Sequence, residues 1–127
     1  LIKFEKRVIQ NRLNLVSLLT KLKKSNKKII ALSAPAKGMT LLNYSKLDGN
    51  YLDYATEKSL IKQGLFTPGV NIPVYSDDRI LKTKPDYALL LAWNFSKEII
   101  RNNNKYLKKG GKFIIPIPKV KIISKKK

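Results

Sequence analysis

The chain has 127 residues, enough for one domain with its own core, and its apolar content of 43% argues against disorder. Cysteine and histidine are absent, which excludes a disulfide framework, a thiolate metal site and a histidine general base. The 27 basic and 8 acidic residues give a net charge of +19, which is typical either of a lysine-coated surface or of a protein that binds nucleic acid or another polyanion.

No segment has the pattern of a signal peptide or of a membrane span. Charged residues interrupt positions 1–20, and the longest apolar run, 87–93, is far shorter than the roughly 20 residues that a bilayer requires. We therefore expect a cytoplasmic protein without membrane contact. The chain begins with Leu1 rather than methionine, and we expect a fragment of a longer protein.

Residues 1–25 predict an amphipathic helix. Its polar positions are mostly Lys, Arg, Asn and Ser, and lysines near its end suit the carboxyl end of a helix dipole. The apolar positions recur at helical spacing and form a wide stripe: Val8, Ile9, Leu13, Leu15, Val16, Leu18, Leu19 and Leu22.

Residues 28–33 predict a buried first strand, which stops at small residues and leads into a helix over 38–46. A strand followed by a tight turn and a helix is typical of sites where free backbone N–H groups and the positive helix end bind a phosphate. Leu41 and Leu42 are the candidates for the buried side of this helix.

The turn between this strand and this helix is the predicted phosphate-binding corner, formed by Ala36, Lys37, Gly38, Met39 and Thr40. Lys37 supplies an ammonium group, Gly38 lets a ligand approach the backbone, and Thr40 adds a hydroxyl. The alternative is that Gly38 only permits tight packing and that Lys37 is solvated, because the segment lacks a complete glycine-rich nucleotide-binding motif.

After a turn at 48–50, residues 51–56 predict a second strand that ends at Glu57. Glu57 lies 19 residues after Gly38, an offset at which an acidic residue often binds ribose hydroxyls in dinucleotide-binding folds. The alternative is a solvated surface glutamate.

The middle of the chain predicts a loop over 58–69 followed by an extended segment at 71–75. Its polar residues contact a ligand, close against another domain of a longer protein, or are the ordinary polar residues of a loop. The candidates are Lys62, Gln63, Asn71 and Tyr75.

In the second half, residues 76–78 predict the start of a short helix, with the Ser76 hydroxyl as its cap, that ends before Pro85. Residues 86–93 predict a strand covered on both faces, because its apolar run is continuous. Trp93 and Asn94 follow at its carboxyl end, where open α/β sheets bind ligands, so Trp93 either stacks on a base or sugar or packs against the protein.

Asn94 is also a candidate cap for a helix over 95–109, which 110–111 would end. The apolar stripe of this helix comprises Phe95, Ile99, Ile100, Tyr106 and Leu107. Residues 113–115 predict a further strand, 120–123 an edge strand, and 124–127 a tail.

Strands and helices alternate along the chain. This pattern predicts a single small three-layer α/β domain, Rossmann-like, with a mainly parallel sheet over 26–123 behind the N-terminal amphipathic helix. Adjacent Asp77 and Asp78 cannot form a metal cage by themselves, so no metal site is predicted.

Five segments, in the same order, resemble the C-terminal domain of the sugar C-methyltransferase family: 33–44, 62–64, 68–74, 85–94 and 110–118. The sequence departs from the family pattern at Met39, Glu57, Leu60 and Asn71, where Asn, Asp, Pro and His are usual. The resemblance implies that this domain holds the phosphates of a nucleoside-diphosphate sugar at the residues proposed above.

The resemblance also implies a longer parent enzyme that methylates a carbon of a keto-sugar. Its upstream parts would bind zinc and S-adenosylmethionine and carry the catalytic residues, so no cofactor and no catalysis are expected in this chain. Two other functions remain open from the residues themselves. They are a lysine-rich module that binds nucleic acid or another polyanion, and a scaffold whose first helix docks a partner domain.

Overall fold

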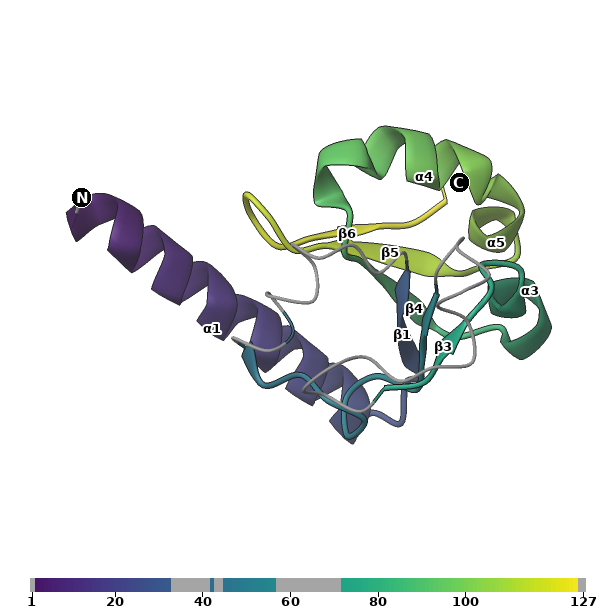
Figure 1. Cartoon of the computed structure of the whole chain (residues 1–127), viewed down its shortest axis with the longest axis horizontal. Helices are drawn as coiled ribbons and strands as arrows, with labels where there is room; N and C mark the ends of the chain where they lie inside the picture. The colour runs from purple at the N-terminus through teal and green to yellow at the C-terminus, as the bar shows by residue number, and fades with distance from the viewer. Residues whose placement is uncertain (1, 33–41, 43–44, 57–71, 126–127) are drawn as a thin grey trace.

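The computed structural model describes residues 2–32, 42, 45–56 and 72–125, and a six-stranded sheet forms its centre. The strand order is β3-β2-β1-β4-β5-β6 (Figure 1). The strands are β1 (Ile29–Leu32), β2 (Ala55–Thr56), β3 (Val74–Tyr75), β4 (Tyr87–Leu90), β5 (Lys112–Ile115) and β6 (Lys121–Ile123). All neighbours pair in parallel except β5 and β6, which pair antiparallel, so the predicted mainly parallel, Rossmann-like α/β sheet is confirmed.

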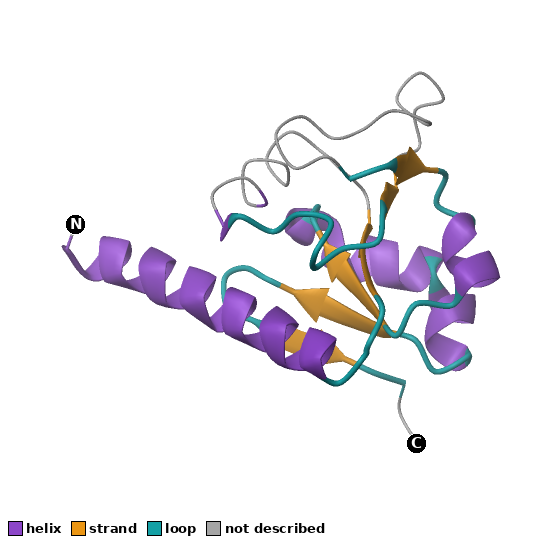
Figure 2. Cartoon of the chain, turned by 90° about the horizontal axis from the view of Figure 1, so that it is seen from below, coloured by secondary structure: helices purple, strands orange, loops and turns teal. Residues whose placement is uncertain are grey.

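Helices cover both faces of this sheet (Figure 2). The long helix α1 (Ile2–Lys24) packs on one face. On the other face lie α3 (Arg79–Thr83), α4 (Ser96–Asn102) and α5 (Asn104–Lys108), and the 3-10 helix η1 (Trp93–Phe95) directly precedes α4. The predicted three layers are therefore confirmed. Within the described residues, no helix combines the length and apolar character needed to cross a membrane.

Two apolar clusters fill the spaces between the layers, because alternate residues of each strand point to opposite faces. On the first face Leu15 and Leu19 of α1 pack with Ile29 of β1. On the second face Ile80 of α3 packs with Ile30 of β1. All four residues of β1 and of β4 are buried, as their continuous apolar runs predict.

Tyr106 anchors α5 to the second face. Its hydroxyl donates a hydrogen bond to the Pro85 carbonyl oxygen at 2.8 Å, and its ring meets Phe113 edge-on, with 5.4 Å between the centroids. A Cβ added to Gly111 would lie 2.2 Å from the Tyr106 ring, so the backbone passes close to it. Gly110 has a φ of 99°, which favours glycine at the end of α5 as predicted.

The predicted N-terminal helix is confirmed, but its wide stripe is not buried along its whole length. Leu15, Leu19 and Leu22 are buried, whereas Ile9 and Leu13 are 46% and 50% exposed. The reason is geometric: the N-terminal half of α1 extends past the sheet (Figure 1). Helical periodicity shows which residues share a face but not where the covering layer ends.

The second strand is shorter than predicted. The backbone N–H groups of Tyr51 and Leu52 donate to the Asp48 carbonyl oxygen, at 2.9 and 3.0 Å, so these residues belong to the turn. The Asp48 carboxylate also accepts from the Asn50 N–H at 2.9 Å, which confirms the turn predicted at 48–50. β2 itself spans Ala55–Thr56.

The single helix predicted over 95–109 is in fact three short pieces. The break lies at Asn103, whose side-chain amide donates to the Ile99 carbonyl oxygen at 2.8 Å and competes with the helical pattern. At the other end, Asn94 does not cap a helix, because it lies within η1. Phe95 is 63% exposed and does not belong to the buried stripe.

Two further boundaries differ from prediction. β4 ends at Leu90, and Trp93 begins η1 rather than ending the strand. The Ser76 hydroxyl donates to the Asp78 carboxylate at 2.8 Å instead of capping α3, which has no side-chain cap. The predicted helix over 38–46 and loop over 58–69 lie almost wholly outside the described residues, although Leu42 is buried as predicted.

Candidate functional site

The carboxyl edge of the sheet between β1 and β4 is the first candidate site. From β1 the sheet continues to β2 and β3 on one side and to β4, β5 and β6 on the other, so the strand order reverses there. Open α/β sheets bind ligands in the crevice at such a reversal. The Leu91 N–H donates to the Leu32 carbonyl oxygen at 3.2 Å, which joins the ends of the two strands.

Two of the predicted site residues lie at this edge. Trp93 is half-buried and Asn94 is exposed, both within η1 directly after β4. The Phe95 N–H closes this turn by donating to the Ala92 carbonyl oxygen at 2.9 Å. The buried part of Trp93 agrees with the predicted alternative of packing against the protein. The exposed part of its side chain is available to a ligand.

A third predicted residue, Tyr75, ends β3. The remaining predicted site residues lie outside the described residues: Ala36, Lys37, Gly38, Met39, Thr40, Glu57, Lys62, Gln63 and Asn71. The structure does describe the strand ends that precede them. Leu32 ends β1, and Thr56, which is buried, ends the neighbouring parallel strand β2. Parallel neighbours end at the same edge, so the segments that carry the predicted phosphate corner and Glu57 both begin there.

An arginine near the end of β3 was not predicted as a site residue. The Arg79 guanidinium carbon lies 3.7 Å from the centroid of Tyr75, which was predicted, and 5.8 Å from that of Tyr54. The two rings meet edge-on with centroids 5.6 Å apart, and Arg79 Nε is buried without a hydrogen-bond partner among the described residues. Such a cation, held over the face of a ring, is suited to an anionic ligand. In the sequence, the only indication of this site is that Arg79 is an isolated arginine shortly after a predicted extended segment in a lysine-rich chain.

Tyr54 completes this aromatic cluster. Its hydroxyl and that of Thr83 share a hydrogen bond of 2.8 Å. Burial raises the pKa of Tyr54 above its usual value, although the Thr83 contact and the nearby Arg79 oppose the shift. Tyr54 therefore stays neutral near pH 7 and acts as a packing and hydrogen-bonding group rather than as a base.

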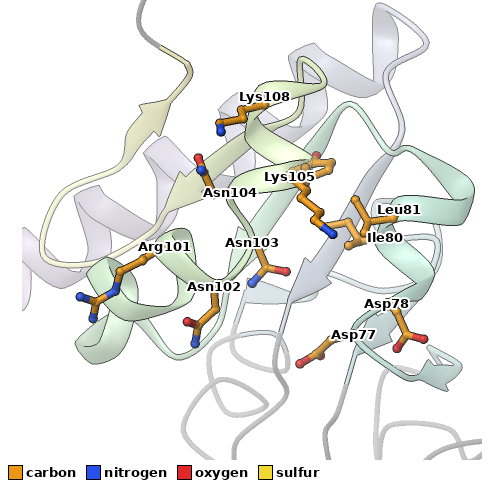
Figure 3. Close-up of a pocket in the computed structure, with 11 residues that line it drawn as sticks. Asp77, Asp78, Ile80, Leu81, Arg101, Asn102, Asn103, Asn104, Lys105 and Lys108 are labelled. Carbon is orange, nitrogen blue, oxygen red and sulfur yellow. The ribbon is translucent and has the colours of Figure 1, made fainter.

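A cavity of about 670 Å³ lies between α3 and the α4–α5 pair. Figure 3 shows Asp77 and Asn103 directed toward this space, and Lys105 extending toward Ile80. The lining residues are Asp77, Asp78, Ile80, Leu81, Arg101, Asn102, Asn103, Asn104, Lys105, Tyr106 and Lys108. No predicted site residue is among them. No sequence pattern indicates this cavity, because it joins two separate segments of the chain.

The walls of this cavity differ in hydrogen-bonding character. Asp77 presents acceptors, and its Oδ1 is buried without a partner among the described residues, whereas Lys105 on the opposite wall only donates. The Ser76 hydroxyl, which donates to Asp78, lowers the pKa of the Asp78 carboxyl, so Asp78 is ionised near pH 7. A ligand between the walls must donate on one side and accept on the other, as hydroxyl groups do.

No set of three or more His, Cys, Asp or Glu side chains within the described ranges is placed to hold a metal ion. The described residues form two surfaces that could contact a ligand: an aromatic and amide surface after β4, and an arginine held by tyrosine after β3.

Comparison with known proteins identifies a family. A family model described as the C-methyltransferase C-terminal domain matches residues 1–118. The chain is also 40% identical over 98 residues to the C-methyltransferase NovU of Streptomyces niveus. The aligned part is 77% of this chain and 23% of that protein, so the chain spans about a quarter of the length of this relative.

Proposed function

The chain belongs to the family of C-methyltransferase C-terminal domains, and from this membership we propose that it binds the nucleoside-diphosphate sugar of a C-methyltransferase. In this proposal the preceding part of the enzyme binds S-adenosylmethionine and carries out the methyl transfer. The enzyme acts in the cytoplasm, and the domain alone does not methylate a substrate.

The observation that carries the proposal is the reversal of strand order between β1 and β4. The residues proposed to hold the diphosphate, Ala36 to Thr40, follow β1 at this point. Trp93 and Asn94 follow β4, the adjacent strand, and the main chains of the two strands are hydrogen-bonded through Leu91. A ligand at this edge would therefore meet a cationic turn on one side and an aromatic surface on the other.

The predicted site residues contact different parts of the ligand in this proposal. Lys37 neutralises phosphate charge, Gly38 lets the phosphate approach the backbone, and Thr40 donates a hydroxyl hydrogen. Glu57, after β2, accepts hydrogen bonds from the ribose, and Lys62, Gln63 and Asn71 contact the rest of the nucleotide sugar. Such binding away from the reacting carbon favours methyl transfer by orienting the sugar.

The test is a calorimetric titration of the 127-residue chain with a thymidine diphosphate sugar, at low and at higher salt. We expect saturable binding near one equivalent that Lys37→Ala weakens and Lys24→Ala, which removes an exposed lysine at the end of α1, leaves unchanged. Trp93 is the single tryptophan of the chain, so its fluorescence reports directly on this edge. Binding without a change in Trp93 emission would place the ligand elsewhere.

A second function, binding of a polyanion, has one specific observation in its favour. The starts of the adjacent strands β1, β4 and β5 bring together exposed lysines at the amino edge of the sheet, namely Lys27, Lys28, Lys84, Lys108 and Lys109. This function predicts that duplex DNA binds with an affinity that falls steeply with salt, and that nucleotide sugars have no advantage over other anions. Absence of both kinds of binding would leave a scaffold role.

A further inference from the structure

Helix α1 has a second apolar face besides the one that packs on the sheet. Ile9, Leu13, Val16 and Thr20 are spaced by four, three and four residues, which is the spacing of a helix–helix seam. Leu15, Leu19 and Leu22, which fill the core, lie on a different side of the helix. The apolar surface of α1 is therefore wider than the side that packs on the sheet of its own domain.

The second face is covered at one end only. Near the carboxyl end of α1, the Thr20 hydroxyl contacts the Tyr51 hydroxyl at 3.5 Å, and Val16 is half-buried against the core cluster. Toward the amino end the same face emerges from the domain, and Ile9 and Leu13 are about half exposed. Figures 1 and 2 both show this part of α1 extending past the sheet.

The extending part is held in a fixed direction. The Asn11 side-chain amide, on the side of α1 opposite to Ile9 and Leu13, donates a hydrogen bond to the Pro116 carbonyl oxygen between β5 and β6. This bond ties α1 to the body of the domain near Ile9 and Leu13. These two side chains therefore form a preorganised apolar ridge, and preorganisation lowers the entropic cost of binding a partner.

We propose that this ridge, Ile9 and Leu13, docks a helix of the part of the C-methyltransferase that precedes this domain. The family model describes a C-terminal domain. The aligned region covers 23% of the relative, so most of that protein lies outside it. Spacing by four, three and four residues is typical of two helices that pack ridge into groove and cross at a small angle. This spacing therefore favours a helix as the partner.

A second copy of the same helix is a poorer partner. Residues 2–24 contain seven basic residues and one acidic residue, so two copies of α1 side by side would repel each other. A neutral or acidic helix with an apolar face could pack on the ridge without being repelled by the basic residues beside it. The inference rests on family membership and on the exposed ridge of α1, and it does not depend on where the nucleotide sugar binds.

The test compares amide hydrogen exchange of α1 in the 127-residue chain and in the whole C-methyltransferase that carries this domain. We expect exchange at residues 8–14 to be about tenfold slower in the whole enzyme, because docking suppresses local opening. Ile9→Lys/Leu13→Lys should abolish this slowing. Gln10→Lys/Asn14→Lys, a matched pair with the same spacing and added charge on the neighbouring exposed face, should retain it.

Two results would overturn the proposal. One is equal exchange of α1 in the isolated chain and in the whole enzyme. The other is self-association of the isolated chain, seen by sedimentation and removed by Ile9→Lys/Leu13→Lys, which would make a second copy the partner. Circular dichroism of the isolated variants checks their folding, and Ile9→Ser/Leu13→Ser replaces the lysine pair if that pair fails to fold.

Discussion

The buried hydroxyl of Tyr106 gives the sharpest prediction for the stability of this domain. It donates to the Pro85 carbonyl oxygen at 2.8 Å, with a second, longer contact to the Lys112 carbonyl oxygen at 3.5 Å. Tyr106→Phe keeps the ring and its packing on Phe113 but leaves the Pro85 carbonyl without this donor. An unpaired buried acceptor costs about 1–3 kcal/mol, so we expect the free energy of unfolding to fall by that amount.

The assay is urea unfolding, followed by circular dichroism, with thermal unfolding as a second measurement. For a domain of this size the expected loss corresponds to a fall in Tm of about 4–12 °C, with an unchanged slope against urea. Tyr51→Phe is the matched control, because within the described part of the chain the Tyr51 hydroxyl makes only the 3.5 Å contact with Thr20, and its loss should change stability by less than about 0.5 kcal/mol. If Tyr106→Phe were as stable as the unmodified chain, or if the two variants lost the same stability, the reasoning would be wrong.

Burial raises the pKa of Tyr54 and of Tyr106 above the usual 10.0, so the folded chain keeps protons that the unfolded chain has released. The stability from this difference is fully present below about pH 10 and is lost as the pH rises further, and Tyr106→Phe should make the decline shallower in urea midpoints measured across that range. Gly111→Ala should destabilise by about 1–3 kcal/mol, since the new Cβ would meet the Tyr106 ring, whereas Gly49→Ala, with nothing within 4 Å, should change stability little. Equal urea midpoints for the two alanine variants would contradict this. Asp77→Ala should not lower stability, and should raise it by up to about 1 kcal/mol, because it removes a buried oxygen that has no partner in the ranges that the structure describes; a loss above about 1 kcal/mol would show that this oxygen is paired.

The sheet was predictable because its signals are local. The run from Tyr87 to Leu91 is continuous and apolar, and only a strand covered on both faces explains such a run in this position. The glycines at 110 and 111 likewise predict the end of α5 directly, because Gly110 adopts a positive φ. These features follow from the chemistry of adjacent residues.

Other features depend on what the chain meets after it folds. Ile9 and Leu15 have the same apolar character, but only Leu15 lies beneath the covering sheet. The helix break at Asn103 comes from one side chain that bonds the preceding turn. The contact of Arg79 with Tyr75 and the cavity beside α3 join residues whose approach depends on how β3, α3 and α5 pack. No pattern along the sequence encodes these distances.

The two edges of the sheet also bear on how the protein behaves at high concentration. An exposed strand edge invites pairing with another molecule, and longer edges invite it more strongly. Here the outer strands are only two residues long in β3 and three in β6, and β6 carries the exposed Lys121. Together with the net charge of +19, these short and charged edges favour a dispersed protein over fibrous or amorphous aggregates.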